Sequence, residues 1–464
     1  MSVKFKQGFI LLWLVLCVPL LFLGYGSDFD AWRVAQCAAD IWEEHRYMPS
    51  RSLGNPLHEF ALAPLVSRGG WVAGNAFSLA FALLFLLGLL RLEKQGHFRH
   101  AKLLLVSLAF LPIIMKNATS TMDYIPALAM LTWSYVFLQE SRWQLAALLL
   151  GVACGFRPTS LLFLIPLLYH IQAVNQDLST TVRTAALALF SAALFYAPLL
   201  VAESFVLPAP VHRSSWLLQA GQIGFHALRT LGVGQALLAA LLLLVFARKN
   251  EQTLLQTHFV RFHLLNLAVW SALFLFLPDA PEYLLPAIPS LIFLSDRLLP
   301  RCAFAALVLL LLSYHVIQLD LRSSNPLQLR PTPHLRGGWS IEDVQDRCFK
   351  LSFRAAADAA SLQRPTVLIY GLPWAVAVNP AWYWEPDLKM FAQKKGNLYL
   401  STAIRDTARI NHLVERGFRL VAWRTASWEN MQLGRVGWPE GVEVIEEIRD
   451  MFDTPIRGKA LNER

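Results

Sequence analysis

Charged side chains are scarce in this chain of 464 residues, because Asp, Glu, Lys and Arg together make up only 16% of it. A soluble domain of average composition is about 25% charged and roughly 45–50% apolar, whereas 55% of this chain is apolar. That balance excludes a disordered chain and a collagen-like fibre, and it argues against a single soluble globule. The composition predicts a membrane protein with many spans.

Cysteine patterning is also absent. The five cysteines form no Cys-x-x-Cys pair and no Cys/His spacing typical of a zinc site. Cys17, Cys154 and Cys302 lie in apolar runs, where a packing role is expected. The chain is therefore not a disulfide-stapled scaffold, and nothing in its cysteines indicates a zinc domain.

Eleven apolar runs predict membrane-spanning helices, since a bilayer core of about 30 Å needs roughly 17–25 apolar residues per helix. The runs are Phe9–Gly26, Trp71–Leu90, Leu103–Met115, Tyr124–Leu138, Leu145–Gly155, Thr159–His170, Ala185–Val201, Leu228–Phe246, Leu264–Pro278, Tyr283–Leu294 and Ala303–Ile317. The fifth and sixth are short, and only Phe156, Arg157 and Pro158 separate them. They form either a tight hairpin or a broken helix that lines a cavity.

The net charge of +9 is concentrated in one set of loops. With the N-terminus inside, the inner loops carry +8 and the rest of the chain carries +1. These loops are residues 1–8, 91–102, 139–144, 171–184, 247–263 and 295–302. An excess of Lys and Arg is typical of cytoplasmic loops, so it does not indicate nucleic-acid binding. We expect a multi-pass protein of the bacterial inner membrane with a cytoplasmic N-terminus.

Two domains are expected. Residues 1–319 form an all-α transmembrane bundle of about 11 helices, whose first outer loop is 27–70. Residues 320–464 form a small α/β domain outside the membrane. Thr366–Tyr370 and Arg419–Trp423 have the pattern of buried strands, and Ala403–Arg416 has that of an amphipathic helix ended by Gly417.

Two carboxylates, Asp28 and Asp30, directly follow the first span. Charge at that depth is costly unless it has a purpose or a wet surrounding. Either carboxylate suits a general base for an acceptor hydroxyl, or both suit a divalent cation such as Mg²⁺ or Mn²⁺. The alternative is structural, because Ser27 or Asp28 also suits the cap of a helix that runs to about Glu44.

Further polar residues gather at the predicted outer ends of the spans. Singly each is typical of a helix boundary, but together they form a ring with two acidic clusters and two cations. Cations at membrane depth suit the phosphate of a lipid-linked substrate. The ring contains Arg51, Asn55, His58, Glu59, Lys116, Asn117, Asp123, Arg157, Glu282 and Tyr283.

Four segments, in chain order, resemble those of the GT-C superfamily of polytopic glycosyltransferases. One of them, Tyr47–Glu59, is similar to the continuation of the first loop in bacterial members. Residues 27–33 (SDFDAWR) are similar to the first-loop acidic motif of GPI-type and protein mannosyltransferases and of aminoarabinose transferases. Residues 155–159 (GFRPT) and 282–289 (EYLLPAIP) resemble two later segments of bacterial members. Glu282 stands where Arg is usual. The resemblance covers roughly Gly8 to Gln318.

The resemblance implies a polyprenyl-phosphate sugar donor, a lipid, glycan or protein acceptor, and a groove for the lipid tail among the spans. Asp28 is the first choice for the general base and Asp30 the second, because the family's carboxylate aligns with either one. Lys116 and Arg157 would bind the donor phosphate. The residues that would shape the acceptor side are Arg51, Asn55, His58, Glu59, Asn117, Asp123, Glu282 and Tyr283.

Two other functions compete with this one. A transporter or lipid flippase would explain the many spans, but it predicts two similar halves, and the halves of this sequence do not correspond. A non-enzymatic scaffold of an envelope complex would leave the acidic pair, Lys116 and Arg157 without a joint purpose.

Overall fold

The structure is a computed structural model that describes residues 2–51, 54–201, 223–224, 226–227, 230–246, 257–278, 280–320, 334–361, 365–369, 392–395, 398–401, 414–423 and 443–445. The chain forms two compact units. The first consists of Met1–Tyr25 and Cys37–Val344, and the second of Gly26–Gln36 and Gln345–Arg464. The divide predicted at 319/320 therefore falls inside the first unit.

The first unit is helical. Its α-helices are α1 (Val3–Cys17), α3 (Pro56–Lys94), α4 (Ala101–Ala109), α5 (Pro112–Ala118), α6 (Tyr124–Gln139), α7 (Trp143–Phe156), α8 (Leu164–Asn175), α9 (Leu178–Val201), α11 (Val233–Phe246), α13 (His258–Phe276), α14 (Ile288–Leu298) and α15 (Arg301–Ser313). Three 3-10 segments join them, namely η1 (Val18–Phe22), η2 (Pro158–Phe163) and η3 (Pro281–Ala287). Helix α2 (Phe29–Glu44) begins in the second unit and ends in the first.

Each of the eleven predicted apolar runs contains helix among the residues that the structure describes. Four described helices are long and apolar enough to cross a membrane, and the bent pair α4–α5 adds a fifth if it is one span. The four are Val3–Phe22, Pro56–Lys94, Leu178–Leu199 and His258–Phe276. By helix length and composition the chain is a multi-pass membrane protein, while the count of eleven spans stays a prediction.

The expected single helix Leu103–Met115 is wrong, because the chain bends by 56° between α4 and α5. Pro112 has no backbone N–H and disfavours the helical region for the residue before it. Leu111 accordingly has extended torsion angles, φ −65° and ψ 130°. The bend turns α5, which carries Lys116, away from the axis of α4.

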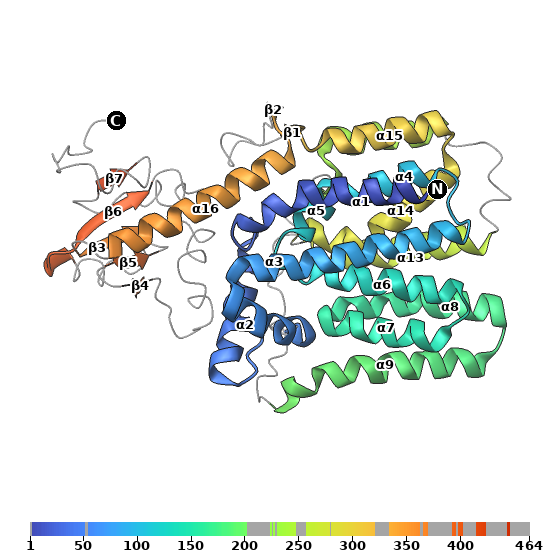
Figure 1. The fold of residues 1–464 in the computed structure, drawn as a ribbon, viewed down its shortest axis with the longest axis horizontal. Coiled ribbons are helices and arrows are strands. Elements are labelled where there is room, and N and C mark those ends of the chain that lie inside the picture. The colour runs from blue at the N-terminus through green and yellow to red at the C-terminus, as the bar shows by residue number, and fades with distance from the viewer. Residues whose placement is uncertain are drawn as a thin grey trace. The chain divides into compact units, whose positions relative to one another are not determined.

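Helices α3, α6, α7 and α9 lie side by side in chain order (Figure 1). Asn75 of α3 ties this layer to the first span, since its amide donates to the carbonyls of Leu21 (3.0 Å) and Gly24 (2.7 Å). Thr121 donates its hydroxyl to the Asn75 carbonyl at 2.8 Å. These bonds fix the loop between α5 and α6, where the candidate residue Asp123 lies.

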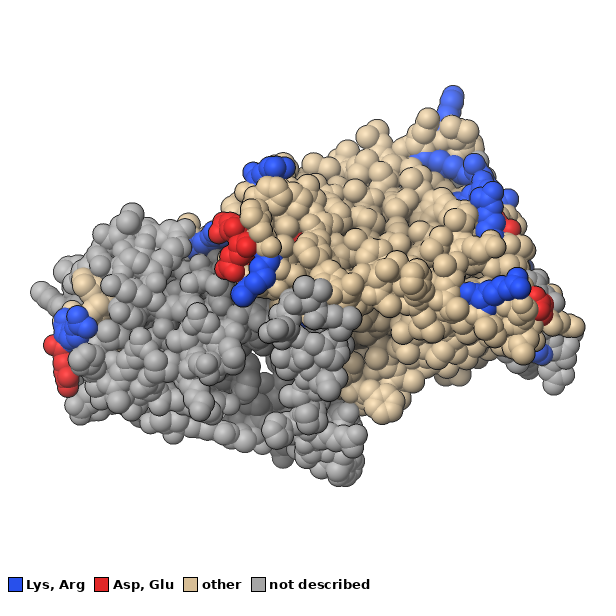
Figure 2. Space-filling model, turned by 90° about the horizontal axis from the view of Figure 1, so that it is seen from below, with Lys and Arg blue, Asp and Glu red and all other residues tan. Residues whose placement is uncertain are grey.

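Charged residues of the first unit pair within two separate sets. Segments predicted inside pair with one another, through Lys6–Glu93 (2.8 Å), Arg91–Glu140 (2.7 Å) and His100–Asp296 (3.0 Å). Residues predicted outside also pair with one another, as described below. On the face shown in Figure 2, a broad band without charged side chains separates the charged regions of the described surface. This arrangement is typical of a protein that faces lipid between two polar ends.

The second unit contains a sheet of five strands in the order β4-β5-β3-β6-β7. Strands β5, β3, β6 and β7 are parallel neighbours, while β4 is antiparallel to β5. The predicted strands are confirmed as β3 and β6, whereas most of the predicted helix 403–416 lies outside the described residues. The strands are β3 (Thr366–Ile369), β4 (Ala392–Lys395), β5 (Leu398–Ser401), β6 (Arg419–Trp423) and β7 (Glu443–Ile445).

Helix α16 (Trp339–Ser361) begins in the first unit and continues into the second. A two-stranded antiparallel ribbon of β1 (Ile317–Asp320) and β2 (His334–Gly337) precedes it. The ring of Trp339 packs on Tyr314, with centroids 5.5 Å apart. The start of α16 is thereby held against the end of α15.

Candidate functional site

A buried ion pair at the predicted outer end joins Asp123 and Arg157. Asp123 directly precedes α6, and Arg157 is the single extended residue between α7 and η2. The Arg157 guanidinium donates through Nη1 to Oδ2 of Asp123 at 2.7 Å. Both side chains are buried, with 7% and 0% of their surface exposed. A buried charge needs such a partner, because removal from water without one is strongly unfavourable.

Two aromatic rings enclose the same guanidinium. Its Cζ atom lies 4.0 Å from the ring centroid of Tyr124 and 4.8 Å from that of Tyr283. Planar guanidinium groups stack well on aromatic faces. The sequence pattern singled out Tyr283 but missed Tyr124, whose only signal was its position directly after Asp123.

Arg51 adds a second cation on the other side of Asp123. Its Nη2 atom lies 3.7 Å from Oδ1 of Asp123, and 22% of its side chain is exposed. Burial by itself raises the pKa of the Asp123 carboxyl, but the charges of Arg157 and Arg51 outweigh burial and hold that pKa below its ordinary value. Asp123 is thus ionised at neutral pH.

Lys116 also has a carboxylate partner. Its ammonium donates to Glu282 Oε1 at 2.9 Å, with 14% and 3% of the two side chains exposed. It lies 5.4 Å from the ring centroid of Trp339 as well. Glu282 therefore balances a cation that α5 carries. The resting site holds Lys116 and Arg157 in two separate ion pairs.

The loop before α3 is organised around Glu59. The carboxylate of Glu59 accepts from the hydroxyl of Tyr47 at 2.5 Å and from the backbone N–H of Ser50 at 2.7 Å. Burial, followed by the charge of Glu59, raises the pKa of Tyr47 above its ordinary value, so its hydroxyl keeps its proton and donates. Tyr47 and Ser50 lie in the segment 47–59 that resembles a GT-C first loop, but the sequence did not single out either one as a site residue.

His58 and Asn117 differ in how they are used. His58 is fully buried, packs against the rings of Phe77 and Phe156, and interacts electrostatically with Asp123 and Arg51. Asn117 instead donates its amide to the carbonyl of Ile113 in its own helix, at 2.8 Å. The predicted acceptor residue His58 therefore lies near Asp123 and Arg51. The amide of Asn117 forms its hydrogen bond within α5.

Asp28 and Asp30 belong to the second unit. Oδ1 of Asp28 accepts from the backbone N–H of Asp30 at 2.9 Å, which is a capping contact at the start of α2. Asp30 lies 3.8 Å from Nη1 of Arg33. The capping alternative is confirmed for Asp28, while its chemical role stays a prediction.

A divalent cation at this pair also stays a prediction. Within the ranges that the structure describes, His, Cys, Asp and Glu form no group of three or more that suits a metal ion. Two carboxylates one residue apart do not choose an ion by themselves.

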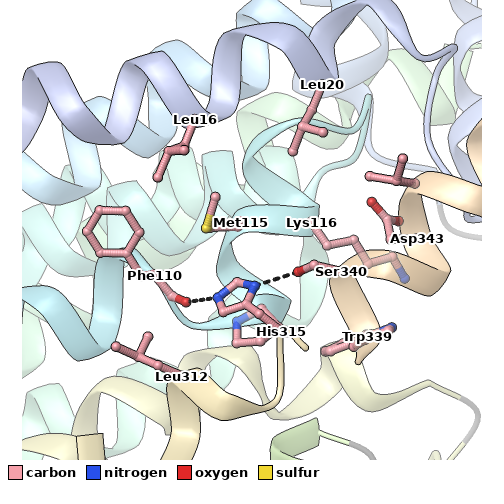
Figure 3. Close-up of a pocket in the computed structure, with 12 residues that line it drawn as sticks. Leu16, Leu20, Phe110, Met115, Lys116, Leu312, His315, Trp339, Ser340 and Asp343 are labelled. Atoms are coloured by element: carbon pink, nitrogen blue, oxygen red, sulfur yellow. Dashed lines mark hydrogen bonds between the residues drawn. The ribbon is translucent and has the colours of Figure 1, made fainter. Parts of the chain in front are cut away.

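A cavity of about 390 Å³ lies next to Lys116 (Figure 3). Most of its wall is apolar, and Lys116 lies at one side of it together with Ser340 and Asp343. The apolar lining consists of Leu16, Leu20, Phe110, Pro112, Met115, Leu312, Trp339 and Val344.

His315 joins two walls of this cavity. Its Nε2 atom donates to the carbonyl of Phe110, and its Nδ1 atom forms a hydrogen bond of 2.6 Å with the hydroxyl of Ser340. Phe110 directly follows α4 at the bend, so His315 satisfies a carbonyl that the broken helix leaves without its usual partner.

No protein-family model and no curated protein sequence matches this chain. Two solved structures that are similar to it are both of ArnT from Cupriavidus metallidurans. The one bound to undecaprenyl phosphate has a TM-score of 0.43 and 14% identity, over 63% of this chain and 60% of that chain. The one in the apo state has a TM-score of 0.41 and 15% identity, over 63% and 59%. The match spans less than two thirds of the length of ArnT.

Proposed function

We propose that this protein is an integral membrane glycosyltransferase that moves a sugar from a polyprenyl-phosphate carrier to an acceptor hydroxyl. The observation that carries the proposal is the position of Lys116 at the polar side of a mostly apolar cavity (Figure 3). A cation beside an apolar wall matches a ligand with an anionic head and a hydrocarbon tail. A polyprenyl phosphate has both parts.

The cations of the site suit the phosphate that leaves during transfer. Lys116 supplies an ammonium group, and Arg157 keeps further N–H donors besides the one that Asp123 accepts. When the bond between the sugar C1 atom and the phosphate oxygen breaks, the electron pair stays on the phosphate. Cations that are fixed before the reaction stabilise this charge without reorganisation.

The proposed base is Asp28, and Asp30 is the second choice. The carboxylate takes the proton of the acceptor hydroxyl while its oxygen attacks C1 from the face opposite the phosphate, so the configuration at C1 inverts. The motif around residues 27–33 supports this assignment through its resemblance to GT-C first loops. The acceptor is a lipid, a glycan or a protein.

The site is proposed to face the extracytoplasmic side of a bacterial inner membrane. Support comes from the charge of the other end, whose loops carry +8 of the net +9. In this orientation the N-terminus is cytoplasmic and the C-terminal strands lie outside.

The experiment is transfer in proteoliposomes that contain the full chain and a panel of polyprenyl-phosphate sugars. Asp28→Asn and Asp30→Asn should abolish transfer at unchanged expression. Full activity in both variants would contradict the assigned base. Absence of transfer with every sugar in the panel, beside measurable solute flux, would support a transporter instead.

A further inference from the structure

Three buried side chains near Asp123, and Asp123 itself, contain polar atoms that form no hydrogen bond within the described residues. We call Asn55, His58, Asp123 and Ser160 the buried polar cluster; each is at most 3% exposed. The atoms are Asn55 Nδ2, both ring nitrogens of His58, Asp123 Oδ1 and Ser160 Oγ, and the nearest cation to Asp123 Oδ1, Nη2 of Arg51, lies 3.7 Å away. Nearly all buried polar atoms in proteins are hydrogen-bonded, so such a concentration indicates a site that a ligand completes.

These atoms are neighbours in the fold. Ser160 lies in the turn that begins at Arg157, and its backbone N–H donates to the Arg157 carbonyl at 2.9 Å. The Asn55 carbonyl accepts from the backbone N–H of Glu59 at 3.0 Å, which places Asn55 at the start of the helix that carries His58. His58 interacts electrostatically with Asp123. The cluster therefore surrounds the carboxylate that holds Arg157.

The chemistry of the cluster points to hydroxyl groups. The Asn55 amide nitrogen only donates, Oδ1 of Asp123 only accepts, and the Ser160 hydroxyl and the neutral His58 ring do both. A phosphate would leave the acceptors unused, and an ammonium would leave the donors unused. A sugar hydroxyl donates and accepts at once, so it matches the mixed set.

Aromatic rings beside His58 provide the other half of a carbohydrate site. The His58 ring centroid lies 5.9 Å from that of Phe77 and 6.3 Å from that of Phe156. A sugar ring has hydroxyls at its edge and C–H groups on its faces, so it suits a polar cluster next to apolar rings.

A chain of contacts links the cluster to the phosphate-binding side. Glu282 pairs with Lys116, its neighbour Tyr283 covers the Arg157 guanidinium, and Arg157 pairs with Asp123. We propose that the buried polar cluster binds the ring hydroxyls of the donor sugar, with His58 as the central contact. This inference rests on the proposed function, because a sugar attached to the carrier phosphate would extend from Lys116 in this direction.

The test compares the affinities of two kinds of lipid for the full chain in lipid nanodiscs. The probes are undecaprenyl phosphate and a panel of undecaprenyl-phosphoryl hexoses and pentoses, with affinities from thermophoresis. We expect the preferred sugar lipid to bind at least about tenfold more tightly than the bare lipid, since one or two charge-assisted hydrogen bonds are worth that factor.

His58→Phe should remove this preference and leave the affinity for undecaprenyl phosphate within about twofold. It should also keep or raise the melting temperature, because it removes unpartnered polar atoms from a site already lined by phenylalanine. The matched control is His170→Phe, which replaces a buried histidine between Trp143 and Phe262. This control should leave both affinities unchanged.

Two results would overturn the sugar subsite. One is a His58→Phe variant that keeps the full preference for the sugar lipid. The other is a His58→Phe variant that lowers the affinities for both lipids by the same factor. Binding of the bare lipid with no preference for any sugar in the panel would also overturn it, while leaving the phosphate site intact. Binding of neither kind of lipid would overturn the proposed function itself.

Discussion

The guanidinium of Arg157 is enclosed on three sides, by the carboxylate of Asp123 at 2.7 Å and by the rings of Tyr124 and Tyr283. The four residues come from three separate parts of the sequence. Arg157 therefore joins the ends of α6, α7 and η3 into one rigid corner, which positions Glu282 for Lys116.

Breaking this pair should destabilise the protein. Asp123→Asn leaves the buried Arg157 cation without its counterion, and we expect a loss of about 3 kcal/mol in the free energy of unfolding. Thermal unfolding in detergent micelles measures the effect. The exposed Asp177→Asn serves as the control, because Asp177 lies at the solvated start of α9. The double variant Asp123→Leu with Arg157→Met should be closer to the wild type than either single change, and additive losses would contradict the pairing.

Acid should weaken the ion pair between Asp123 and Arg157 and so lower the free energy of unfolding. The pKa of Asp123 is lowered from its ordinary value of 3.8, so the unfolded chain binds a proton more readily than the folded one. The stabilisation is complete above pH 3.8 and is lost as the pH falls through the lowered pKa of the folded state. The unfolding midpoint should therefore drop as the pH decreases toward and below this range. Asp123→Asn should remove that part of the pH dependence.

Lys116 and Glu282 should have opposite effects on phosphate binding. Lys116→Gln removes the cation at the cavity, and we expect the affinity for undecaprenyl phosphate to fall on the order of tenfold. Glu282→Gln releases Lys116 from its ion pair, so the affinity should rise. Titration of the lipid into protein in nanodiscs measures both. A loss of similar size in both variants would mean that the ion pair itself, and not the cation, is required.

Substitutions at Asp28 can separate capping from catalysis. Asn caps a helix about as well as Asp but carries no charge. Ala carries no charge either, and it does not cap. We expect Asp28→Asn to keep the unfolding midpoint and lose transfer, and Asp28→Ala to lose roughly 1 kcal/mol of stability in addition. If Asp28→Asn keeps its activity and Asp28→Ala loses it, the residue has a structural role only.

Much of the secondary structure follows from the sequence, because a helix in lipid needs only local hydrogen bonds and a run of apolar side chains. The eleven runs and the strand Arg419–Trp423 were predictable for this reason. The bend before Pro112 also has a local signal, since proline restricts the residue that precedes it.

The pairing within the site was not predictable in the same way. Lys116 and Glu282 are 166 residues apart, and each is a plausible boundary residue where it stands. Their contact depends on how α5 and η3 are packed, which no local pattern records. Trp339 was assigned to the outer domain, yet it lies beside Lys116. Aromatic residues such as Tyr124 carry no sequence signal that distinguishes stacking on a cation from ordinary packing.

The ion pair between Lys116 and Glu282 has a consequence for how a lipid phosphate enters. The cation is already neutralised, so binding is an exchange in which the phosphate displaces a carboxylate that belongs to the protein. The affinity then depends on how much more favourably the phosphate interacts with Lys116 than the Glu282 carboxylate does. It does not reflect the full attraction of an unpaired ammonium. A small anion gains little from this exchange, whereas a lipid phosphate adds the burial of its tail in the neighbouring cavity. Glu282 thus acts as an internal competitor that favours ligands with a long apolar chain.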